Sequence, residues 1–257
     1  MSKFSLSIRS FARHHFVKSS SVALACVCIA GSLSACSDED DDTETGTGNL
    51  ETDLSFFVSS TTHDGNLGGL AGADKICQDL ATAEGAGSKT WRAYLSVANN
   101  GTPIHAKDRI GDGPWYNAKG MKMADNVAAL QALTGNADMF ITEKGDKVNG
   151  QWNSSNGMNG APANEHDVMT GSGLDGTLMM TMDAMTGMLA QTTCSDWTSN
   201  TLQPGPQVGH TDGMGPMMNQ ATTNFTSWSG GHAAAGCSSA DLAARGGAGR
   251  IYCFAAN

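Results

Sequence analysis

The chain has 257 residues, with 15 Lys and Arg against 25 Asp and Glu and a formal net charge of −10. This acidic balance, without any basic patch, excludes nucleic acid as a partner, because phosphate binding needs clustered positive charge. Glycine contributes 32 residues and aromatic side chains only 6%, so the composition predicts a loop-rich fold with few long helices.

The first 35 residues have the pattern of an export signal. Positive residues precede an apolar run of about a dozen residues, Val22 to Leu33, whereas a membrane-spanning helix needs roughly 20. The run ends in Leu33-Ser34-Ala35-Cys36, which resembles the lipobox of bacterial lipoproteins. That resemblance implies removal of residues 1–35 and lipidation of Cys36. The alternative is ordinary cleavage that leaves Cys36 as a thiol.

Residues 36–52 are predicted to be an acidic, disordered tether. They contain Asp38-Glu39-Asp40-Asp41-Asp42 and then Thr45-Gly46-Thr47-Gly48, and repelling charges with glycines favour an extended chain. Calcium capture by the acidic run is an alternative, although binding without a fixed cage would be weak. Because more than one acyl chain anchors a protein stably, we expect a lipid-anchored protein of the cell envelope. Ser37 after the cysteine favours the outer membrane.

Residues 53–257 form one predicted domain, with its clearest secondary-structure signals near the two ends. The patterns predict a strand over 54–60, a turn-rich loop over 64–69, a helix over 70–84 and a second strand over 91–97. They also predict a short helix over 127–133 and a closing strand over 251–254. Residues 145–230 are mostly Gly, Asn, Ser, Thr, Asp and Met, which predicts long loops resting on the core.

Four cysteines remain in this domain: Cys77, Cys194, Cys237 and Cys253. An even number in an oxidising compartment predicts two disulfides, and three pairings are open. A four-thiolate zinc site is the alternative, but the spacings contain no Cys-x-x-Cys pair.

Several short motifs together resemble a known module. The segments 68–77, 91–96 and 194–197 are similar in order and spacing to parts of the endostatin module of collagens XV and XVIII. Other stretches, 109–117, 166–172 and 208–210, resemble uncharacterised bacterial lipoproteins with a C-type lectin-like domain. The resemblance implies an α+β, C-type lectin-like (endostatin-like) fold with small antiparallel sheets, flanking helices and long loops. It also implies the disulfides Cys77–Cys253 and Cys194–Cys237.

Sugar-binding C-type lectins use calcium, but this sequence departs from their motifs. Gln203-Pro204-Gly205 and Trp228-Ser229-Gly230 lack the calcium-ligating side chains of the lectin loop and strand. Calcium needs about six to eight oxygen ligands, and the loop carboxylates that could supply them elsewhere are Asp167, Asp175, Asp183, Asp196 and Asp212. Ca²⁺ is therefore a candidate cofactor, and scattered carboxylates that only aid solubility are the alternative.

Aromatic and thioether side chains give further candidates. The residues suited to stacking on a sugar ring are Trp115, Tyr116, Trp152, Trp197 and Trp228. The Gly-Pro turn before Trp115 predicts that this side chain is exposed, and core packing is the alternative for each aromatic. A run of methionines between Met179 and Met188 is interpreted as packing, with Cu(I) binding as the alternative.

No catalytic motif is recognisable, and the His residues of the domain are scattered. We therefore predict a non-enzymatic binding module, displayed on the envelope, that recognises a glycan or an extracellular protein through its long loops. The alternative is a structural or adhesive envelope lipoprotein without a small-molecule ligand. The residues assigned to ligand binding are Trp115, Tyr116, Asp167, Asp175 and Asp212.

Overall fold

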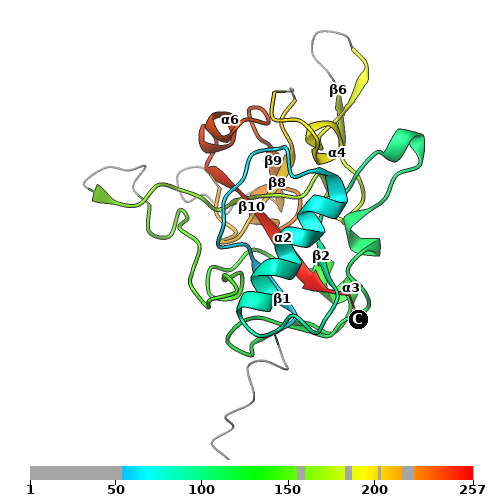
Figure 1. Cartoon of the computed structure of the whole chain (residues 1–257). Coiled ribbons are helices and arrows are strands. Elements are labelled where there is room, and N and C mark those ends of the chain that lie inside the picture. The colour runs from blue at the N-terminus through cyan, green and yellow to red at the C-terminus, as the bar shows by residue number, and fades with distance from the viewer. Residues whose placement is uncertain (1–53, 155–159, 183–186, 202–203, 216–222, 257) are drawn as a thin grey trace, which may run out of the picture. The chain divides into compact units, whose positions relative to one another are not determined.

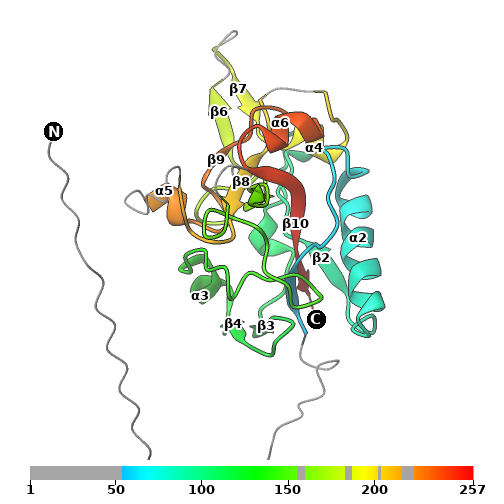
Figure 2. The ribbon, with the colours of Figure 1, turned by 90° about the vertical axis from the view of Figure 1, so that its left-hand side faces the viewer.

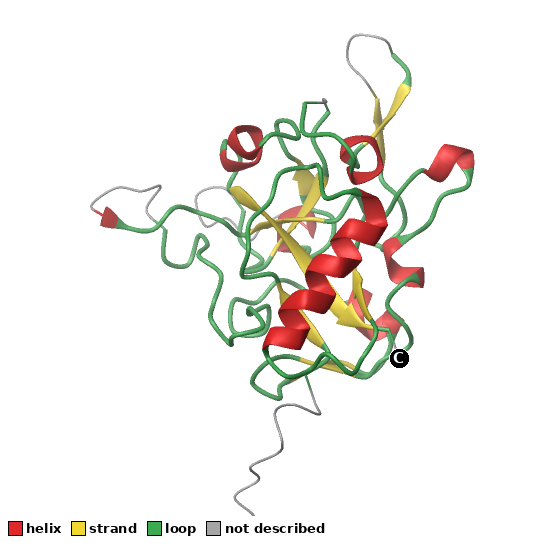
Figure 3. Ribbon diagram, viewed as in Figure 1, coloured by secondary structure: helices red, strands yellow, loops and turns green. Residues whose placement is uncertain are grey.

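A computed structural model describes residues 54–154, 160–182, 187–201, 204–215 and 223–256 (Figure 1). The predicted signal, the lipidation site Cys36 and the acidic tether lie outside the described residues. Short helices and strands alternate with long loops in the part that is described (Figure 3). None of its helices has the length and apolar character needed to cross a membrane.

The last strand, β10 (Gly247–Ala255), is the centre of the main sheet. Its C-terminal half pairs antiparallel with both β1 (Phe56–Val58) and β2 (Trp91–Ala93). Its N-terminal half runs parallel to β5 (Asp167–Met169), and the sheet continues through β8 (Gln207–His210) to β9 (His232–Ala233). Two separate ribbons are formed by β3 (Trp115–Tyr116) with β4 (Lys122–Ala124), and by β6 (Met180–Met182) with β7 (Leu189–Gln191).

The longest helix, α2 (Gly69–Ala83), lies against β10 and β2 (Figure 2). Its buried residues Ala73, Cys77 and Ala81 are four apart and so share one face. The other helices are short: α3 (Val127–Gln131), α4 (Cys194–Trp197), α5 (Thr223–Thr226) and α6 (Ser239–Ala243), with single 3-10 turns at Asn99–Gly101 and Ala106–Asp108. Helices this short are stabilised by packing and by their caps rather than by their own hydrogen bonds.

Alternate residues of β10 face two apolar layers. Ile251, Cys253 and Ala255 lie in the layer under α2, whereas Tyr252 and Phe254 lie in the opposite, aromatic-rich layer. From Ile251 to Ala255 both faces of the strand are buried, so this half of its sequence is a continuous apolar run instead of an alternation.

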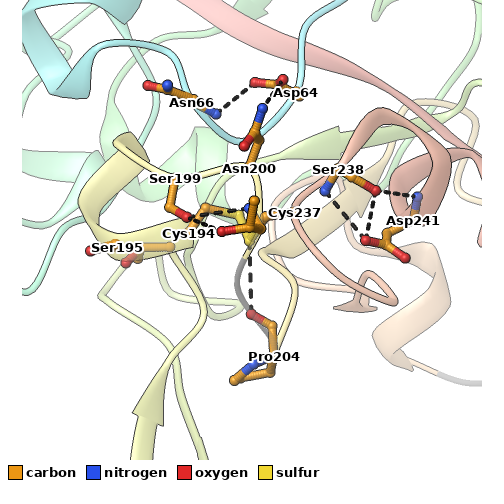
Figure 4. Close-up of a disulfide and its surroundings, with 12 residues drawn as sticks. Asp64, Asn66, Cys194, Ser195, Ser199, Asn200, Pro204, Cys237, Ser238 and Asp241 are labelled. Atoms are coloured by element: carbon orange, nitrogen blue, oxygen red, sulfur yellow. Dashed lines mark hydrogen bonds between the residues drawn. A yellow bond between two sulfur atoms is a disulfide. The ribbon is translucent and has the colours of Figure 1, made fainter.

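Two disulfides close the fold, and they are the two pairs that the resemblance implied. Cys77 in α2 is joined to Cys253 in β10, with Cα atoms 5.4 Å apart. Cys194 is joined to Cys237, with Cα atoms 5.7 Å apart. Figure 4 shows the second bond beside the start of α6, where the side chain of Ser238 and that of Asp241 form a capping box.

The turn at α4 has a left-handed backbone. Four consecutive non-glycine residues, Cys194 to Trp197, have φ between 50° and 67°, a conformation that costs roughly 1–2 kcal/mol per residue. The Cys194 disulfide and the Asp196 carboxylate, which accepts hydrogen bonds from the backbone N–H groups of Ala98 and Asn99, hold this turn in place.

Residues 145–230 differ from the prediction of loops that merely rest on the core. This segment contributes β5 and β8 to the main sheet, and Val168, Met169 and Val208 are buried within it. The sheet is also not purely antiparallel, because β5 runs parallel to β10. The prediction was wrong here because each apolar stretch is only two or three residues long, and burial on both faces of a strand removes the alternating pattern.

Candidate metal centre

Three neighbouring strands bring a group of polar side chains to one end of the main sheet. His166 precedes β5, Asp167 begins that strand, His210 ends β8, and His232 begins β9. Because β5 and β8 are antiparallel with Asp167 opposite His210, the start of one strand lies beside the end of the other. Strand pairing thus collects residues that are far apart in the sequence.

The three imidazoles surround the carboxylate of Asp167. The Nε2 atoms of His166 and His210 lie 3.1 and 3.2 Å from Oδ1, and Nε2 of His232 lies 3.4 Å from Oδ2. His166, Asp167 and His210 each offer a ligand atom within 4.8 Å of the others. In a tetrahedral zinc site with bonds of about 2.0 Å, neighbouring ligand atoms are about 3.3 Å apart. The spacing therefore suits a shared metal ion.

Hydrogen bonds at the other ring nitrogen fix the orientation of each imidazole. Nδ1 of His210 lies 2.9 Å from the carbonyl oxygen of Phe225, and Nδ1 of His232 lies 3.0 Å from that of Ala233. A carbonyl only accepts, so in both rings Nδ1 carries a proton and Nε2 is the nitrogen that faces Asp167. Nδ1 of His166 bonds the carboxylate of Asp212 at 2.7 Å. Metal-binding histidines typically have this arrangement.

The centre is buried and incompletely satisfied. The side chains of His166, Asp167 and His210 are at most 3% exposed. Both carboxylate oxygens of Asp167 and Nε2 of His210 lack a hydrogen-bond partner among the described residues. Buried polar atoms are rarely left without a partner, and lone pairs that face a carboxylate repel it. A cation between them would satisfy all three atoms.

The protonation states differ among these groups. Burial lowers the pKa of His166, but the carboxylates of Asp167 and Asp212 outweigh this effect and raise it to about 9. Burial lowers the pKa of His210 below its usual value, and the neighbouring His166 and His232 add to this effect. Without a metal ion, His166 is therefore an imidazolium at neutral pH, and its proton partly takes the place of the cation.

Metal binding requires a small rearrangement. The rings of His166 and His210 stack with centroids 4.5 Å apart and planes at 10°. An ion bound by a histidine lies near the plane of the ring, and two parallel rings do not share one in-plane ion. For His166 and His210 to hold one ion, one of the two rings would therefore have to tilt.

The centre opens onto a cleft of about 880 Å³. Its walls are formed by residues 62–64, Gln151, residues 163–166 and the stretch from α6 to Ala248, with His210 and His232 beside them. The side chain of His232 is 24% exposed and is thus the member of the group nearest to solvent. Catalytic and ligand-binding metal sites keep one open side of this kind, whereas structural zinc sites are closed.

The structure assigns different surroundings to the residues predicted for ligand binding. Asp167 and Asp212 lie together in the candidate metal centre. Asp175 is not part of this cluster and accepts hydrogen bonds from the backbone and side chain of Thr177 in a turn. Tyr116 is half-buried in β3. The five carboxylates proposed for calcium are therefore not one site, and Asp183 lies outside the described residues.

The prediction that Trp115 is exposed was wrong. Its side chain is 1% exposed, its ring packs edge-on against Phe254, and its Nε1 donates to the carbonyl oxygen of Ala255 at 3.1 Å. The Gly-Pro turn is at the surface, but the next side chain points inward. Trp197 and Trp228 are fully buried too, and Trp152, 37% exposed, is the most accessible tryptophan that the structure describes.

The methionine-rich stretch is not core packing in this structure. Met182 and Met188 are 62% and 66% exposed on the β6–β7 hairpin, which projects from the body of the domain (Figure 2). Met185 lies outside the described residues. Adjacent Leu189 is equally exposed, so the hairpin presents an apolar surface, typical of interaction sites.

The histidine cluster does not follow from the sequence patterns alone, although the sequence contains partial signals of it. His166-Asp167 and His210-x-Asp212 place ligand types next to each other. The missing step was the pairing of β5, β8 and β9, which periodicity did not reveal. No family model matches this chain, and no curated protein is significantly similar to it.

Proposed function

We propose that the protein is a metal-dependent binding module, which holds a divalent transition-metal ion through His166, Asp167 and His210, with His232 as a further ligand. The observation that carries this proposal is the convergence of three Nε2 atoms on the buried Asp167 carboxylate, with each Nδ1 engaged elsewhere.

The donor set determines the kind of ion. Imidazole nitrogen with one carboxylate suits Zn²⁺, Cu²⁺, Ni²⁺ or Fe²⁺, whereas Ca²⁺ takes oxygen ligands almost exclusively. Asp212 is the outer carboxylate that orients His166, and such partners strengthen a histidine ligand. We therefore propose a zinc-class ion in place of the Ca²⁺ that the loop carboxylates made a candidate cofactor.

The wider architecture fits a module displayed outside the cytosol. The α+β arrangement, the long loops and the pairs Cys77–Cys253 and Cys194–Cys237 support the proposed C-type lectin-like fold. Disulfides persist in oxidising compartments, which supports the proposed lipid-anchored envelope location. The metal-containing cleft is then the surface that meets a ligand.

A direct metal titration tests the proposal. The purified full-length chain is stripped with chelator and titrated with Zn²⁺ against a chromophoric competitor, and Ca²⁺ is titrated in parallel by calorimetry. We expect one Zn²⁺ per chain and no comparable Ca²⁺ binding. His210→Ala should weaken Zn²⁺ binding by at least tenfold.

His105→Ala is the matched control, because His105 is a half-buried histidine outside the centre whose Nδ1 accepts from the backbone N–H of Leu178. This variant should bind Zn²⁺ like the wild type. Equal zinc affinity in the His210 variant, or tighter binding of Ca²⁺ than of Zn²⁺, would contradict the proposal.

A further inference from the structure

The walls of the cleft differ from those of a typical sugar-binding site. Among the described residues that line it there is no Trp, Tyr or Phe, and about half of them are small: Thr62, Ala163, Ser239, Ala243, Ala244, Gly246, Gly247 and Ala248. Sugar rings and other flat apolar groups are usually bound against aromatic faces. Recognition in this cleft must therefore depend on polar and charged groups.

Arg245 is the only Arg or Lys among the described residues that line the cleft. It is exposed and lies just after Ala244, the C-cap residue of α6. Within the described ranges its guanidinium has neither an ion pair nor a hydrogen bond, whereas Arg250 is paired with Glu165 and Arg109 with Asp74. Arg245 thus presents a free fork of N–H donors to the cleft.

The carboxylates that share the cleft already have partners. Glu165 pairs with Arg250. Asp64 accepts hydrogen bonds from the backbone N–H of Asn66 at 2.8 Å and from the side chain of Asn200 at 2.8 Å. Neither of these two carboxylates forms an ion pair with Arg245. Its positive charge is therefore available to an anion that enters from solvent.

The backbone next to Arg245 packs directly against the metal centre. The carbonyl oxygen of Gly246 accepts a hydrogen bond from the backbone N–H of Asp167 at 3.1 Å. Gly246 has φ +100°, and a Cβ atom there would lie 2.7 Å from Nδ2 of Asn164 and 3.6 Å from the ring of His166. A glycine is therefore required at this position. Arg245 directly precedes this glycine in the chain, so its backbone lies next to the metal centre.

We infer that the cleft binds a ligand with a terminal oxyanion, a carboxylate or a phosphate, which reaches the metal ion with one oxygen and Arg245 with the others. This inference rests on the proposed metal centre. Guanidinium and oxyanion match as two parallel N–H···O bonds, and a metal ion with an open position takes an anionic oxygen. The volume, about 880 Å³, accommodates a small molecule of which the oxyanion is one end.

The test uses the full-length chain loaded with Co²⁺, whose visible absorption reports ligands that enter the metal's coordination sphere. Inorganic phosphate and acetate are titrated separately into the wild type, Arg245→Gln, Arg245→Lys and the control Lys144→Gln. Lys144 is exposed and does not line the cleft, so this control loses the same charge elsewhere. Melting temperatures establish that all four proteins are folded.

We expect at least one of the two anions to change the Co²⁺ spectrum, and the one that does identifies the ligand group. Arg245→Gln should weaken that anion by about tenfold or more, since hydrogen bonds to charged groups are stronger than neutral ones. Arg245→Lys should recover only part of the affinity because it keeps the charge without the fork. Lys144→Gln should match the wild type.

The outcomes separate this inference from the proposed function. If Co²⁺ and Zn²⁺ fail to bind, both the metal centre and the oxyanion site are wrong. If Co²⁺ binds but neither anion changes its spectrum, only the oxyanion site is wrong. The same holds if an anion binds equally well to the wild type and to Arg245→Gln, since its affinity then comes from the metal alone.

Discussion

Asp167→Asn changes one atom of the buried carboxylate at the middle of the histidine cluster, and it gives the sharpest test of the metal centre. The amide keeps the size of the carboxylate but removes the charge that attracts a cation. Because Asp167 is only 2% exposed, solvent does not compensate for the lost charge. We expect the variant to lose zinc-dependent stabilisation while it keeps the fold.

The magnitude follows from linkage between binding and folding. An ion that binds only the folded state at 100 times its Kd stabilises that state by about 2.7 kcal/mol. For a domain of about 200 residues, 1 kcal/mol corresponds to roughly 2–4 °C in Tm. Zinc should therefore raise the Tm of the wild type by about 5–11 °C and leave that of Asp167→Asn nearly unchanged.

The assay is thermal unfolding with Zn²⁺, with Ca²⁺ and with chelator. Glu143→Gln is the matched control, because Glu143 is also a buried carboxylate, 3% exposed, and accepts a hydrogen bond from the backbone N–H of Ser60 outside the cluster. This control should keep the full zinc shift. A shift of the same size in Asp167→Asn as in the wild type would refute the reasoning.

Trp115→Ala should lower the free energy of unfolding by about 3–5 kcal/mol, measured by urea denaturation, because a buried indole is removed; a near-neutral effect would contradict its burial. In metal-free protein, the raised pKa of His166, about 9 against 6.5 when unfolded, stabilises the fold fully below pH 6.5. Stability should fall as pH rises from 6.5 to 9, and His166→Gln should remove this dependence in urea titrations. Replacing Cys194 and Cys237 together with Ser should lower the free energy of unfolding by about 4 kcal/mol in the chain-entropy model and weaken zinc binding, because Cys237 anchors the segment between His232 and α6; unchanged zinc affinity would show that the two sites are uncoupled. Cys36→Ala should abolish labelling by a fatty-acid analogue, and equal labelling of this variant would show that Cys36 is not the lipidated residue.

Local sequence signals were sufficient where one element determines its own structure. The helix predicted over 70–84 is α2 (Gly69–Ala83), because its apolar residues repeat at helical spacing and need only one partner face. The short helix predicted over 127–133 is α3 for the same reason, and its start is capped by the Asn126 side chain. The strand predicted over 251–254 is part of β10.

The candidate site could not be predicted in this way, because it depends on which strands are neighbours. His166 and His232 are distant in the chain, and only the order β5-β8-β9 places them at one end of the sheet. Trp115 shows the same limit at a single residue: the turn before it was a valid surface signal, but the direction of the side chain depends on Phe254 at the end of β10.

The central position of β10 has a consequence for biosynthesis. This strand is the last element of the described chain, yet β1, β2 and β5 all take their hydrogen bonds from it. On a growing polypeptide β1 and β2 lack this pairing until residues 247–255 emerge, whereas β5 can already pair with β8, and non-local pairings of this kind are slow to form. His166 and His210 meet once β5 pairs with β8. β1 and β2 should therefore be the strands that wait longest along the chain for their sheet partner.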